Sequence, residues 1–303
     1  MADANCARET VLDLVDSLKK YSSHLIASEY FNEDYFLETF DKITPYLAFQ
    51  IITFNRLKLF RSRASSYATD IENIRQISYP PEHRATKTQR CNSVGQQMLY
   101  GSSNIETSLL ELDLSDGEPC ALVAEFLLKE SETLNVLPIG EIDHYRRFDR
   151  LRIETPGVLE RIVSLLDGLN HWERLAYQYV DAFLADLMLR TAASEQEKKN
   201  LYEVTSRIAN AFWSNNPAVD GLLYPSVKHQ GGINLAVLPH SFDRAFELER
   251  VSLTGPIENL GYGLFAFYIH ADAVRTTENG DFIWQTRNYH ANARSTIPLS
   301  AES

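Results

Sequence analysis

The chain has 303 residues, of which 29 are Lys or Arg and 41 are Asp or Glu, so its formal net charge at pH 7 is -12. A surface of this sign repels nucleic-acid backbones and anionic membranes, which argues against both as partners. An anionic dinucleotide can still bind if a few arginines create a local positive pocket, so the positions of the arginines are more informative than their number.

The start of the chain and its cysteines indicate a cytoplasmic protein. The segment MADANCARETVLDLVDSLKK has no basic region followed by an apolar one, and no apolar run approaches the about 20 residues of a membrane span. Cys6, Cys91 and Cys120 form no CxxC pair and have no histidines at zinc-ligand spacing. We therefore expect reduced thiols and no metal site.

The first part of the chain predicts helices followed by a strand. Apolar residues recur at helical spacing from residue 7 to about residue 54, which predicts an N-terminal helical extension over 1–54, broken near Pro45. The segment LKLFRSRASSYA then predicts a strand that ends in Arg61 and Arg63. A long polar loop follows, and loops of this kind in compact domains often form lids or binding elements.

Three short elements come next: a strand over 97–100, a helix over 105–112 and a buried strand over 121–128. Their close succession places Tyr100 and Glu111 near each other. Arg90 precedes them, and a guanidinium, a flat ring and a carboxylate together suit a dinucleotide. Taken singly, the three residues are explained by a surface salt bridge, core packing and a solvated helix face, so only their combination indicates a binding pocket.

The rest of the chain mixes helices and strands. Residues 156–190 are strongly helical with an interruption at Gly168, and Ser194 with Glu197 predicts a capping box that opens a further helix. We interpret about 142–215 as a helical insertion. Short strands are then predicted in LLYPS, NLAVL, 248–253 and 264–269. Because helices and strands do not alternate strictly, the predicted class is α+β.

The order of these motifs resembles the RES domain. LFRSRA is similar to the family's opening strand, RCNSVGQQMLYGSS to the segment that runs into its tyrosine strand, SLLEL to its glutamate helix and DGLLYPSVKHQGGINLAVL to its serine-bearing segment. The resemblance covers roughly Leu57 to Leu253. It implies catalytic roles for Glu111, Arg90, Tyr100 and Ser226, and dinucleotide-binding roles for Arg61, Arg90, Tyr100 and Asn92.

The resemblance also implies a fold and an activity. The expected fold is an ADP-ribosyltransferase-like mixed-sheet core over 55–270, with a C-terminal tail over 271–303. The expected activity is that of a toxin-type enzyme that degrades NAD⁺, as a glycohydrolase or a phosphorylase, with NAD⁺ as substrate rather than cofactor and an antitoxin protein as partner. Glu111 would stabilise the cationic ribose, Arg90 and Arg61 would bind the pyrophosphate, Tyr100 would stack near the nicotinamide, and Ser226 would hydrogen-bond the substrate.

Two other functions stay open. The same pocket could transfer ADP-ribose to a macromolecular target, because the acceptor depends on loops that the sequence does not decode. Alternatively, the chain could be a catalytically silent RES-like binding module, since Gln89 and Cys91 stand where the family has glycine and tryptophan. The sequence also leaves open whether an antitoxin exists and whether the chain forms a homo-oligomer.

Overall fold

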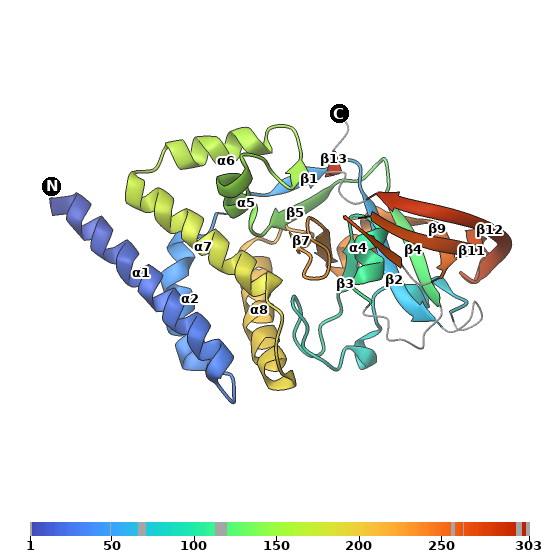
Figure 1. The fold of residues 1–303 in the computed structure, drawn as a ribbon, viewed down its shortest axis with the longest axis horizontal. Coiled ribbons are helices and arrows are strands. Elements are labelled where there is room, and N and C mark those ends of the chain that lie inside the picture. The colour runs from blue at the N-terminus through green and yellow to red at the C-terminus, as the bar shows by residue number, and fades with distance from the viewer. Residues whose placement is uncertain are drawn as a thin grey trace.

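The computed structural model describes residues 2–48, 50–65, 71–112, 120–255, 258–262, 264–294 and 299–300. Long helices occupy one side of the molecule and a large twisted sheet occupies the other (Figure 1). Within the described residues, no helix is both long and apolar enough to cross a membrane.

The helices fall into an N-terminal pair, a central group and several short turns between strands. In chain order they are α1 (Ala2–Ala27), α2 (Glu33–Ile43), the 3-10 turn η1 (Thr44–Tyr46), α3 (Ile74–Ile77), the 3-10 turn η2 (Glu82–Arg84), α4 (Ile105–Leu110), α5 (Glu141–Phe148), α6 (Val158–Asp167), α7 (His171–Leu189), α8 (Glu195–Asn215) and α9 (Pro239–Ala245).

Eleven strands in the described part of the chain form one sheet, in the order β1-β5-β7-β8-β3-β2-β4-β9-β11-β10, with β12 paired to β11. Their bounds are β1 (Ile52–Phe54), β2 (Lys58–Ser65), β3 (Leu99–Ser102), β4 (Cys120–Leu128), β5 (Leu134–Pro138), β7 (Gly221–Pro225), β8 (Ile233–Val237), β9 (Phe246–Thr254), β10 (Glu258–Gly261), β11 (Leu264–Thr276) and β12 (Phe282–Arg294). Strands β6 (Ile153–Glu154) and β13 (Leu299–Ser300) pair separately. Because β5 and β7 run parallel while β7 and β8 run antiparallel, the sheet is mixed, and the α+β class is confirmed.

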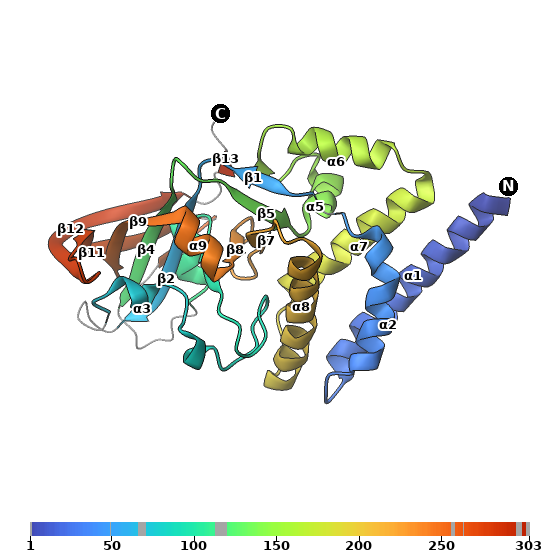
Figure 2. The same ribbon diagram turned by 180° about the vertical axis from the view of Figure 1, so that it is seen from behind.

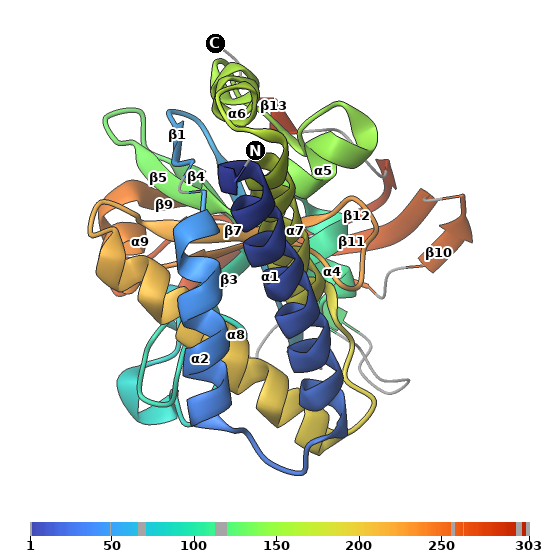
Figure 3. The ribbon, with the colours of Figure 1, turned by 90° about the vertical axis from the view of Figure 1, so that its left-hand side faces the viewer.

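The N-terminal helices pack on the central ones. Figure 3 shows α1 and α2 side by side in front of α7 and α8. Their apolar faces share one buried cluster with those two helices, and the cluster continues onto the sheet through Leu137, Leu222 and Ala236. The extension therefore shares a buried core with the central helices and one part of the sheet. On the other side, α9 lies over the sheet (Figure 2). Its Phe242 packs against Phe126 of β4, with ring centroids 5.0 Å apart.

Two boundaries differ from those predicted by the sequence. Residues 52–54 form the edge strand β1, which pairs with β5, so the chain joins the sheet before residue 54. Three residues are too few to show the alternation that identifies a strand. At the other end, β11 continues to Thr276 and β12 pairs along it, so the sheet extends past residue 270 into the predicted tail. Residues 295–298 and 301–303 of that tail lie outside the described residues.

Local signals at helix starts explain where the central helices begin. Asn170 caps α7, and the side chain of Glu173 accepts a hydrogen bond from the Asn170 N–H. Together these two contacts form a complete capping box. Ser194 accepts from the N–H of Glu197 at the start of α8 as predicted, but the Glu197 carboxylate accepts from the Ala193 N–H instead of that of Ser194. The helix interruption predicted at Gly168 is confirmed, because α6 ends there.

Candidate functional site

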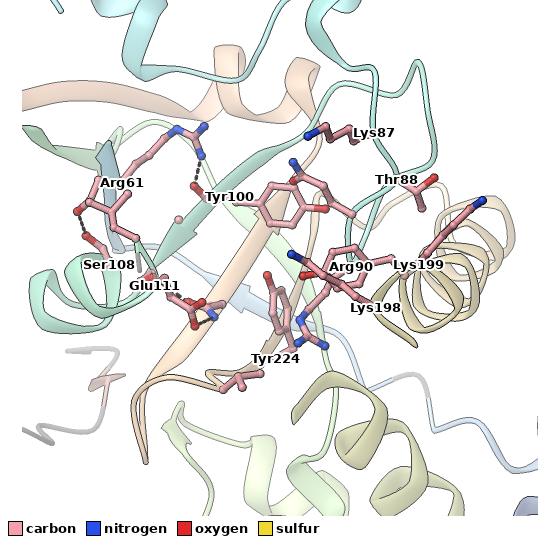
Figure 4. Close-up of a pocket in the computed structure, with 18 of the residues that line it drawn as sticks. Arg61, Lys87, Thr88, Arg90, Tyr100, Ser108, Glu111, Lys198, Lys199 and Tyr224 are labelled. Atoms are coloured by element: carbon pink, nitrogen blue, oxygen red, sulfur yellow. Dashed lines mark hydrogen bonds between the residues drawn. The ribbon is translucent and has the colours of Figure 1, made fainter. Parts of the chain in front are cut away.

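A cavity of about 770 Å³ lies where the sheet meets α8, and its volume is within the range of about 300–1,000 Å³ typical of small-ligand sites. Its walls come from β2, β3, β7 and β8, from the loop over residues 86–90, from the end of α4 and from the first turns of α8. Arg61, Arg90, Tyr100 and Glu111 all line it. Figure 4 shows these side chains around a common space.

Glu111 is held in place by two hydrogen-bond donors. It follows α4, whose first turn is fixed by Asn104, the side chain of which accepts from the Thr107 N–H. The Oε1 atom of Glu111 accepts from Ser226 Oγ at 2.6 Å and from Asn234 Nδ2 at 2.7 Å. Its Oε2 atom has no hydrogen-bond partner among the described residues, so one carboxylate oxygen is oriented while the other remains available to a ligand.

Asn234 is itself oriented by a neighbouring strand. It lies in β8 and is 7 % exposed, and its Oδ1 accepts from the Ser102 hydroxyl of β3 at 2.7 Å. Because the Glu111 carboxylate can only accept, the NH₂ group of the amide points to Glu111 and its oxygen faces Ser102. Sequence reasoning missed Asn234. The available signal was a polar residue within the apolar strand INLAV.

Ser226 does not line the cavity, but it supports Glu111 from behind. Its hydroxyl donates to Glu111 and accepts from the N–H groups of Lys228 and His229, at 3.2 and 3.0 Å. The turn that follows packs closely on α4, because a Cβ on Gly232 would lie 2.6 Å from Thr107 Oγ1. Ser226 is 4 % exposed, and we interpret it as a positioning residue for Glu111.

Tyr100 and Asn92 form a second supported pair. The Tyr100 hydroxyl donates to Asn92 Oδ1 at 2.7 Å and accepts from the Cys91 N–H at 2.9 Å. Burial raises the pKa of Tyr100 well above its usual value, so the phenol stays neutral. Asn92 is buried behind the tyrosine and also donates to the carbonyls of Ser93 and Gln96, so it supports the ring and does not face the cavity. Tyr100 lines the cavity, and Figure 4 shows its ring there.

Arg61 places a positive charge in the wall of the cavity. It lies in the middle of β2, not at its end as the sequence suggested, and its Nη1 donates to the Tyr100 carbonyl at 2.5 Å. Burial, together with the neighbouring Arg63 cation, lowers the pKa of the Arg61 guanidinium to about 9, so it remains charged at neutral pH. Its Nε is buried and has no hydrogen-bond partner in the described part of the chain.

The Arg90 side chain makes its contacts within the protein. Its Nη1 and Nη2 donate to the carbonyls of Leu187 and Arg190, at 3.1 and 3.0 Å, and its guanidinium lies over the Tyr202 ring, 5.5 Å from the centroid. A cation at the C-terminal end of α7 is favoured by the helix dipole. Two of the donors predicted to clamp a pyrophosphate are therefore occupied by backbone carbonyls.

Gln89 and Cys91, the two departures from the family pattern, leave the turn around Arg90 intact. The Gln89 N–H donates to the Asn92 carbonyl at 2.9 Å, which closes the turn without a glycine at residue 89. Cys91 is 1 % exposed, so the position of the family's tryptophan points into the core here and supplies no ring to the cavity. Tyr224 of β7 and Tyr202 of α8 provide aromatic walls instead, and sequence reasoning missed both.

Comparison with known proteins identifies the family. The RES domain matches residues 58–260, and no curated protein matches the chain. A RES domain is consistent with an NAD-related domain of the toxin type. Since the match spans more than half of the 303 residues, the chain belongs to the RES domain family.

Proposed function

We propose that this protein cleaves the bond between nicotinamide and ribose in NAD⁺. The observation that carries the proposal is the carboxylate of Glu111, which is fixed by Ser226 and Asn234 in a cavity that also contains Arg61 and the ring of Tyr100. A carboxylate with one bonded and one available oxygen can accept hydrogen bonds from ribose hydroxyls, and the aromatic wall offers a flat surface to the nicotinamide.

The reaction requires stabilisation of a cation. When the bond between ribose C1′ and the nicotinamide nitrogen breaks, the electron pair moves to the ring nitrogen and positive charge develops on the ribose, as in other glycosidic cleavages. The Glu111 carboxylate stabilises that charge, and because its donors are already in place, little reorganisation is needed at the transition state. Water then adds to C1′ and releases a proton, giving free nicotinamide and ADP-ribose.

Mass analysis of NAD⁺ incubated with the purified protein tests the proposal. Glu111→Gln keeps the size of the side chain but removes its charge and replaces one acceptor oxygen with an NH₂ donor, so we expect kcat to fall by about 100-fold or more. Glu130→Gln is the matched control, because Glu130 is an exposed glutamate away from the cavity. Full activity of Glu111→Gln would remove this carboxylate from the mechanism.

The products distinguish the alternatives. Free ADP-ribose indicates hydrolysis, and ADP-ribose 1-phosphate formed only with added phosphate indicates phosphorolysis. Label retained on a macromolecule after incubation with labelled NAD⁺ and cell extract indicates transfer. Intact NAD⁺ after hours, together with measurable NAD⁺ binding, would refute catalysis and support a silent binding module.

A further inference from the structure

Two lysines that no family motif includes line the same cavity. Lys87 comes from the loop that precedes Arg90, and Lys198 comes from the first turns of α8. In Figure 4 both side chains extend toward the Tyr100 ring, whereas the amine of Lys199 is turned away from Glu111. Two separate elements thus bring ammonium groups to the part of the cavity beyond the carboxylate.

The charge around the cavity is positive although the chain as a whole is negative. Among the described residues, the lining cations are Arg61, Lys87, Arg90, Lys198 and Lys199, and the lining carboxylates are Glu111, Glu195 and Glu203. Five cations against three anions leave a local excess of two positive charges in a chain of net charge -12. Such a reversal concentrates anionic ligands at the site.

The lining carboxylates do little to neutralise the two lysines. Lys198 has one ion pair, a 3.7 Å contact with Glu195, whose side chain is 93 % exposed and gives weak pairing. Glu203 is engaged by Thr88 and by Arg207. Lys87 has no ion pair or hydrogen bond with any residue of the described part of the chain. Neither ammonium group therefore has a strong partner within the protein.

We propose that Lys87 and Lys198 bind the pyrophosphate of a nicotinamide dinucleotide, the role that the sequence suggested for Arg90. The inference rests on the proposed function, because it places the nicotinamide ribose at Glu111. A bound dinucleotide would then extend from Glu111 past Tyr100 to the two lysines, with a cation on each side of its phosphates. Arg90 holds the loop that carries Lys87 against the end of α7 and so acts on this subsite indirectly.

Binding can be measured in the Glu111→Gln variant, in which we expect turnover to be slow. We expect Lys87→Met and Lys198→Met, each added to it, to weaken NAD⁺ binding by about tenfold in calorimetric titrations, because each removes a charge-assisted contact. Lys198→Arg should restore most of the affinity, since it keeps the charge. Inorganic pyrophosphate should compete with NAD⁺, and its affinity should fall in parallel in the methionine variants.

Lys19→Met is the control, because Lys19 is an exposed lysine of α1 that does not line the cavity. Unchanged thermal midpoints in the lysine variants would show that a weaker affinity is not a folding defect. NAD⁺ affinity that is unaffected by both methionine substitutions, or reduced NAD⁺ affinity with unchanged pyrophosphate affinity, would overturn the inference. Binding with this lysine dependence but without NAD⁺ cleavage by the wild type would refute only the proposed function.

Discussion

The clearest test of the site geometry is Arg90→Met, because the sequence and the structure assign this residue different roles. If Arg90 clamps the substrate, its loss weakens NAD⁺ binding and leaves the fold unchanged. If it tethers the loop over residues 86–90 to the end of α7, its loss destabilises the protein. The two hydrogen bonds to Leu187 and Arg190 and the contact with the Tyr202 ring support the second role.

The size of the effect follows from these contacts. Hydrogen bonds from a charged donor contribute about 1.5–3 kcal/mol each when buried, and the cation–π contact adds about 0.5–1 kcal/mol. Arg90 is only partly buried, so we expect about 2–4 kcal/mol in total. At about 2 °C per kcal/mol for a chain of this size, the thermal midpoint should fall by about 4–8 °C.

Thermal unfolding followed by circular dichroism, with and without NAD⁺, measures both roles. The control is Arg56→Met, because Arg56 is exposed and lies outside the cavity. We expect the Arg90 variant to melt earlier than this control and still to be stabilised by NAD⁺. An unchanged midpoint combined with the loss of that stabilisation would refute the tether and restore Arg90 as the clamp.

Two further outcomes follow from the structure. Asn234→Ala removes one of the two donors to Glu111, so kcat for NAD⁺ cleavage should fall by about tenfold or more, with a much smaller change in KM. For Asp181, burial and the nearby carboxylates raise the pKa to about 6, so between about pH 4 and 6 the folded state holds a proton that the unfolded chain has released. This group therefore makes the free energy of unfolding decrease as pH rises through that range, and urea titrations at pH 4.5 and 6.5 should show a smaller decrease for Asp181→Asn.

Local patterns in the sequence were enough to predict the central strand β4 and to bring Tyr100 and Glu111 to one site. The apolar run of β4 is buried between β2 and β9, as its composition indicated. Tyr100 and Glu111 lie on the same cavity because a short strand and a short helix separate them along the chain. Contacts of this kind depend on a few turns of backbone, which propensity and periodicity describe well.

The remaining part of the site depends on how distant elements dock, which no local pattern records. Arg90 could be recognised as a candidate, but its partners are carbonyls about a hundred positions further along the chain, and backbone carbonyls have no sequence signal. Lys198 belongs to a charged helix face that is indistinguishable from a solvated one until the helix is placed. The role of Asn234 could be recognised only from the register of β3 against β8, which places it opposite Ser102.

The helical insertion is therefore best understood as part of the site. The end of α7 supplies the carbonyls that hold Arg90, and α8 supplies Lys198 and Tyr202 to the cavity wall. The two helices are in turn buried against α1 and α2, so the N-terminal extension fixes the position of the wall that they form. A change in the packing of α1 would shift Lys198 relative to Glu111 without contacting either residue. For this reason, we expect NAD⁺ binding to require residues 1–54 and 142–215 together with the rest of the RES domain.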